Sequence, residues 1–116
     1  MEKIFDRMSY ETLVREGLQC KRFDYEGANA DVFDSLWMKQ LQYNKDKTAQ
    51  NYFELGLKMG KVITWMSDAI QKLHNRYIEN DSIREELNEC MAILSEPSME
   101  NIEIAGLKAL KAIGLI

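Results

Sequence analysis

Residues 48–78 read TAQNYFELGLKMGKVITWMSDAIQKLHNRYI, and this stretch decides the fold. Apolar or small residues recur in it at alternating steps of four and three, which is the spacing of a heptad seam. The seam consists of Tyr52, Gly56, Met59, Ile63, Met66, Ile70, Leu73 and Tyr77. Leu55, Val62 and Ala69 widen the seam on one side, which favours a helix in a multi-helix bundle over a two-stranded coiled coil.

The length of this helix sets a constraint on the rest of the chain. A continuous helix over residues 48–78 would be about 45 Å long, whereas a compact chain of this size has a diameter of about 35 Å. The helix therefore either extends beyond the other elements or is broken. Gly56 and Gly60 are the expected bending points, since glycine inside a helix costs about 1 kcal/mol relative to alanine.

Amphipathic segments on both sides of the central helix complete an all-α pattern. We expect helices over 10–20, capped by Ser9, over 31–43, capped by Asn29 or Asp31, over 81–94, and from Ser98 to about residue 113. Residues 23–30 have no helical period and are the expected loop. The 116 residues, 46% of them apolar, suit one domain spanning 1–116. The predicted fold is a single-domain bundle of four to five helices around the 48–78 helix.

The C-terminal helix could lie on a membrane surface or belong to the bundle. Lys108 and Lys111 accompany its apolar face, but two lysines attract an anionic surface only weakly. Burial of Ile102, Leu110 and Ile113 would contribute about 1.5 to 3 kcal/mol each. We therefore expect the helix to be part of the core, with Leu115 and Ile116 covering its end.

Several function classes are disfavoured by composition. Charges interrupt every apolar run before the ~20 residues of a membrane span, and the first residues lack the apolar core of a secretory signal. These features predict a cytoplasmic protein without membrane association. Cys20, Cys90 and the single histidine, His74, give no metal-ligand spacing, and no glycine-rich phosphate loop is present. We expect no cofactor and no metal.

One carboxylate pattern offers an enzymatic alternative. Glu85, Glu86 and Glu89 are followed by Glu100 and Glu103. This pattern resembles the MazG-type nucleotide pyrophosphatases, all-α proteins with Glu-Glu-x-x-Glu on one helix and Glu-x-x-Asp on another. The resemblance covers residues 85–103 and departs from the family in Glu103, where Asp is expected, and in a shorter gap. It implies an Mg²⁺-dependent pyrophosphatase that uses these carboxylates; otherwise they form a solvated face and first-turn charges.

Charge is unevenly distributed along the chain, whose net charge is -4. Residues 79–103 contain eight acids and one base, whereas residues 39–76 contain seven bases and three acids. One end could therefore steer toward a basic partner, or the two ends could meet head to tail in an oligomer. The basic, amide-rich region 39–61 could also contact phosphates and base edges of a nucleic acid. Overall acidity and the lack of arginine in this region argue against that second alternative.

Side chains on the outer side of the central helix form the predicted contact surface. These are Leu57, Lys58, Lys61 and Trp65, and an exposed Trp beside Lys is a typical binding hot spot. Alternatively, the N-terminal segment covers Trp65. Glu85, Glu86 and Glu89 form a second predicted surface, for a basic partner. Without a defensible catalytic set, we expect a non-enzymatic protein-interaction module that regulates or inhibits a larger macromolecule. Self-association is also expected, and small phage or mobile-element inhibitors often look like this.

Overall fold

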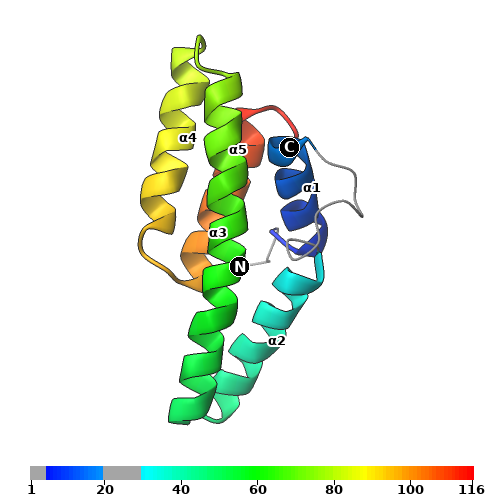
Figure 1. Cartoon of the computed structure of the whole chain (residues 1–116), viewed down its shortest axis with the longest axis vertical. Helices are drawn as coiled ribbons and strands as arrows, with labels where there is room; N and C mark the ends of the chain where they lie inside the picture. The colour runs from blue at the N-terminus through cyan, green and yellow to red at the C-terminus, as the bar shows by residue number, and fades with distance from the viewer. Residues whose placement is uncertain (1–4, 20–29) are drawn as a thin grey trace.

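The computed structural model describes residues 5–19 and 30–116, and these form five helices (Figure 1). The helices are α1 (Arg7–Leu18), α2 (Ala30–Lys45), α3 (Ala49–Arg76), α4 (Asp81–Leu94) and α5 (Met99–Ala112). The central helix α3 contacts all four others. The predicted all-α fold with a long central helix is confirmed. Cys20 and most of the predicted 23–30 loop lie outside the described residues, as does Asn29, one of the two predicted caps of the second helix.

Side-chain caps explain where the helices begin. Thr48, Asn80 and Ser98 each accept a hydrogen bond from the backbone amide three residues later, at 3.0 to 3.1 Å. The prediction that Ser9 caps the first helix is wrong. Asp6 is the cap and accepts a hydrogen bond from the amide of Ser9 at 3.0 Å, so the helix begins three residues earlier than predicted.

The core surrounds the C-terminal half of α3, where α1, α4 and α5 pack against it. Phe5 precedes α1 and is fully buried. The buried apolar side chains of α3 are Leu55, Val62, Met66, Ala69, Ile70 and Leu73. Those of α4 and α5 are Leu87, Cys90, Leu94, Ile102, Ala105, Ala109 and Leu110. The burial of Ile102 and Leu110 confirms that the C-terminal helix belongs to the core.

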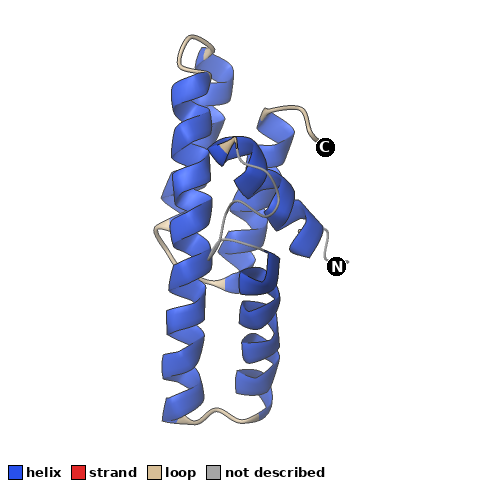
Figure 2. Ribbon diagram, turned by 45° about the vertical axis from the view of Figure 1, so that its right-hand side comes forward, coloured by secondary structure: helices blue, strands red, loops and turns tan. Residues whose placement is uncertain are grey.

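The N-terminal half of α3 extends beyond this core. A helix over Ala49–Arg76 is about 42 Å long, close to the longest dimension of the molecule, 47 Å. It is continuous through Gly56 and Gly60, so the helix is not broken there and of the two alternatives it extends beyond the other elements. The helix α2 packs against α3 and α1 but not against α4 or α5. Among the described residues, the far end of the molecule therefore consists of α2 and the start of α3 (Figure 2).

This arrangement corrects part of the predicted seam. Tyr52 is 66% exposed and Gly56 is exposed, because α4 and α5 are each about half as long as α3 and do not reach these residues. On α2, Leu41 is likewise exposed. At the C-terminus, Leu115 and Ile116 are exposed rather than placed over the core, because the chain turns at Gly114, which has a φ of 80°.

No helix among the described residues combines the length with the apolar composition that crossing a membrane requires.

Candidate functional site

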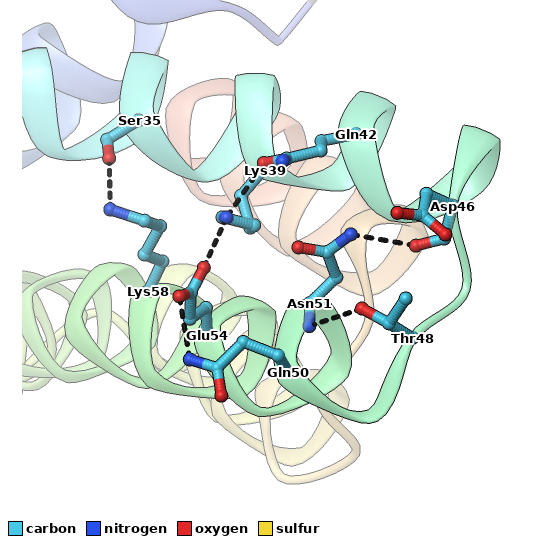
Figure 3. Close-up of polar contacts among 9 residues, drawn as sticks. All are labelled: Ser35, Lys39, Gln42, Asp46, Thr48, Gln50, Asn51, Glu54 and Lys58. Carbon is cyan, nitrogen blue, oxygen red and sulfur yellow. Dashed lines mark hydrogen bonds and ion pairs between the residues drawn. The ribbon is translucent and has the colours of Figure 1, made fainter.

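The two-helix end of the molecule is held together at its turn. The Asn51 side chain donates a hydrogen bond through Nδ2 to the carbonyl of Asp46 at 2.8 Å (Figure 3). Asn51 is 7% exposed and is the buried polar residue of the described part of the chain. Nearby, the ring centroids of Tyr43 and Tyr52 lie 5.8 Å apart. These contacts fix the start of α3 against the end of α2.

A ladder of polar contacts joins α2 to α3 along one side. Lys58 Nζ donates to Ser35 Oγ at 2.6 Å, and Lys39 forms an ion pair with Glu54 (Figure 3). Gln50 also donates to Glu54, at 2.9 Å. Hydrogen bonds from Gln50 and Lys39 lower the pKa of the Glu54 carboxyl. At neutral pH Glu54 is therefore a carboxylate that offsets the charge of Lys39.

Ser35, Lys39, Glu54 and Lys58 line an open groove of about 690 Å³, which we call the basic groove. Its lining consists of Ser35, Met38, Lys39, Gln42, Glu54, Leu57, Lys58 and Lys61. Met38 is 65% exposed and Leu57 is 55% exposed, so apolar side chains stand beside the lysines. The ion pairs of the described residues leave Lys58 and Lys61 without a carboxylate partner. With three lysines and Glu54 in its lining, the groove thus offers a net charge of +2 next to apolar contact area.

The structure groups three of the four predicted contact residues. Leu57, Lys58 and Lys61 line the basic groove, whereas Trp65 is partly buried against the core and does not. The contribution of α2, chiefly Met38 and Lys39, was not predicted. Residues 35, 38, 39 and 42 follow the three-and-four spacing of one helix face, which is a signal that the sequence does contain.

A second groove, which we call the neutral groove, has a volume of about 620 Å³. Its lining consists of Gln40, Tyr52, Leu55, Gly56, Met59, Gly60, Ile63, Thr64, Pro97, Ser98 and Met99, none of which is charged. A Cβ atom added at Gly56 or Gly60 would meet nothing within 4 Å. The neutral groove therefore exposes helix backbone between apolar side chains.

The acidic residues of α4 do not form a metal site with those of α5. Glu89 pairs with Lys108 at 2.9 Å, and this contact raises the pKa of Lys108. Because α4 and α5 are antiparallel, Glu103 and Glu85 lie on opposite sides of that pair along the helix axis. Glu103 is about 7.5 Å from the pair along this axis. Among the described residues, no group of three His, Cys, Asp or Glu side chains is arranged to hold a metal ion.

The remaining MazG-like carboxylates are distributed over the surface. Glu85 and Glu100 are exposed, while Glu86 and Glu103 are partly buried. On the predicted acidic surface, Glu89 is therefore in an ion pair, whereas Glu85 and Glu86 are not in an ion pair of the described residues. The structure does not bring together the two carboxylate sets that the resemblance implies.

Other reactive side chains are poorly placed for catalysis. Cys90 is buried on α4, and desolvation raises the pKa of its thiol to about 12, so it is not a thiolate nucleophile at neutral pH. His74 is partly buried on α3, and its Nδ1 has no hydrogen-bond partner.

No family model, curated protein or solved structure matches this chain.

Proposed function

We propose that this protein is a non-enzymatic protein-binding module, a regulator or inhibitor of a larger macromolecule, that binds an acidic amphipathic segment of its partner in the basic groove. One observation carries this proposal. Lys58 and Lys61, which lack carboxylate partners, lie beside exposed Leu57 and Met38 in one groove. A helix with carboxylates on one edge and apolar side chains on its face would satisfy both features.

The lysines and the apolar residues have separate roles in this recognition. Lys58 and Lys61 steer an acidic segment toward the groove and raise its rate of association. Leu57 and Met38 supply the area that leaves water on binding, at about 25 cal/mol per Å² of apolar surface. Because lysine is a point charge without the planar fork of arginine, the groove selects for negative charge more than for bidentate geometry.

The groove is organised before any partner arrives. Lys58 is held by Ser35, and Lys39 is held by Glu54, so both ammonium groups are already placed between the helices. Asn51 fixes the turn that joins these helices. Side chains that are ordered in the free protein lose less entropy on binding, which favours affinity.

Site-specific photo-crosslinking tests the proposal. A photoreactive residue at position 57 of the full chain, expressed in the native host, should crosslink to a protein segment rich in Glu, Asp and large apolar residues. The Lys58→Glu/Lys61→Glu variant should lose this crosslink. The matched control, Lys72→Glu/Lys111→Glu, carries the same change in charge on exposed residues outside the groove and should retain it.

Three outcomes would contradict the proposal. Crosslinks to RNA or DNA at position 57 would favour the nucleic-acid alternative for the basic 39–61 region. A protein crosslink that survives Lys58→Glu/Lys61→Glu would show that the lysines do not recognise the partner. Mg²⁺-dependent release of pyrophosphate from nucleoside triphosphates, lost in Glu86→Gln and Glu89→Gln, would favour the enzyme.

A further inference from the structure

The neutral groove lies where the core stops covering α3. Pro97 and Ser98, in the connection from α4 to α5, and Met99, the first residue of α5, line the groove together with Ile63 and Thr64 of α3. Towards its N-terminus, α3 extends past α4 and α5 with α2 beside it, while Leu55 and Val62 still face the core (Figure 2). The uncovered side bears a 66% exposed Tyr52.

We infer that a second copy of this chain covers the neutral groove, in a two-fold dimer in which the N-terminal halves of two α3 helices pack antiparallel. This inference does not rest on the proposed function, because the neutral and basic grooves share no lining residue. By helical spacing, Gly56 and Ile63 also lie on the side of α3 opposite Lys58 and Lys61.

The groove can take a helix at close range. Gly56 and Gly60 are one helical turn apart, and the space beyond both is open. Tyr52, Met59 and Ile63 flank them with apolar area. A symmetric interface places each patch against itself, so like charges within the patch would repel. The absence of charge in this lining removes that obstacle to self-association.

Charges at the two ends of the groove specify a second copy and its direction. At one end, Lys45 at the end of α2 and Lys47 in the α2–α3 turn are exposed and outnumber Asp46. At the other end, Glu96 in the α4–α5 connection and Glu100 in the first turn of α5 are exposed. None of these four Lys and Glu residues is in an ion pair of the described part of the chain. Antiparallel packing brings each basic end to the acidic end of the other copy, whereas parallel packing would place like charges together.

The size of the uncovered surface sets the expected affinity. Residues 49–62 extend about 20 Å along the helix axis, and with α2 beside them the surface is about 20 Å wide. This gives about 400 Å² on each copy, less than the ~800 Å² per partner that is usual in stable complexes. Because a two-fold interface closes on itself, the product is a dimer and not a filament. We expect a dissociation constant in the micromolar range.

Sedimentation equilibrium from about 5 to about 500 μM covers that range. The wild-type chain should pass from monomer to dimer, and Gly56→Glu should remain monomeric. The added side chain at position 56 meets open space in the free chain, so Gly56→Glu should melt no lower than the wild type. The matched control, Gln71→Glu, introduces the same charge at an exposed position of α3 outside the groove and should dimerise normally.

A charge exchange tests the direction. Glu96→Lys/Glu100→Lys and Lys45→Glu/Lys47→Glu should each dimerise about tenfold more weakly than the wild type at low ionic strength. An equimolar mixture of the two variants should regain wild-type affinity, because it restores opposite charges at both contacts. Melting curves of each variant check that the fold is intact.

A wild-type chain that is still monomeric at about 500 μM overturns the inference and leaves the groove to a different protein. Dimerisation of Gly56→Glu at wild-type affinity overturns it as well, because the dimer would then use another surface. A mixture that binds more tightly than the wild type, or no better than the separate variants, overturns the antiparallel direction.

Discussion

Replacement of Gly17 by alanine should destabilise the protein, although alanine is the better helix former. Gly17 is buried in α1 against Ala69 of α3. A Cβ atom at position 17 would lie 2.5 Å from the Ala69 carbonyl oxygen, 2.6 Å from its Cβ and 2.7 Å from its Cα. Non-bonded carbon atoms prefer about 3.5 to 4.0 Å, and backbone atoms of α3 cannot rotate aside. The two helices must therefore move apart by about 1 Å.

The expected loss of stability follows from two opposing contributions. Overpacking of a filled core costs about 1 to 3 kcal/mol. Against this, alanine gains at most about 1 kcal/mol over glycine in a helix, and less near a helix end. With a gain of about 0.5 kcal/mol at this second-last residue of α1, the net loss is about 0.5 to 2.5 kcal/mol, which lowers the Tm of a domain of this size by about 3 to 12 °C.

Thermal and urea denaturation, followed by circular dichroism at low micromolar concentration, measure this effect. The matched control is Gly56→Ala, whose Cβ would meet nothing within 4 Å. That substitution should raise the free energy of unfolding by about 0.5 to 1 kcal/mol. A Gly17→Ala variant as stable as the wild type would refute the close contact between α1 and α3.

Three other predictions concern single residues. In a Cys20→Ser variant, Cys90 should resist thiol reagents at pH 8 until the chain unfolds, because burial raises its pKa to about 12. Since the thiol of the unfolded chain has a pKa near 9.0, this group stabilises the fold below pH 9, and that contribution should decline as pH rises toward 12. The Glu54 carboxyl should titrate below 4.5 by NMR, and Gln50→Ala should move its pKa upward; its stabilising contribution is therefore present above pH 4.5 and is lost at lower pH. Asn51→Ala should cost about 1 to 2 kcal/mol in urea denaturation, whereas Gln50→Ala at pH 7 should change stability by less than about 0.5 kcal/mol.

Local signals in the sequence were sufficient for most helix boundaries. The predicted helix over 81–94 is confirmed at both ends, because Asn80 caps it and Ser95, Glu96 and Pro97 follow it. The first helix shows the limit of such signals. Asp6 and Ser9 are both good capping residues and lie three positions apart. Residue type alone does not determine the backbone geometry that places Ser9 inside the first turn.

The candidate site was predictable on one helix only. Leu57, Lys58 and Lys61 were placed together because their spacing puts them on one face of α3. That Lys39 and Met38 complete the groove depends on how α2 packs against α3, which joins residues about twenty positions apart. Trp65 follows the same helical spacing, yet tertiary packing covers it in part.

The sequence by itself determined that the chain is helical and which face of each helix is apolar, because both follow from interactions between residues three and four positions apart. The tertiary structure alone decided which parts of those faces are covered. Tyr52 and Gly56 belong to the same heptad seam as Met66 and Ile70, but only the latter two are buried. The difference arises because α4 and α5 are too short to reach the N-terminal half of α3. Whether a helix distant in sequence covers a residue cannot be predicted from the spacing of its neighbours.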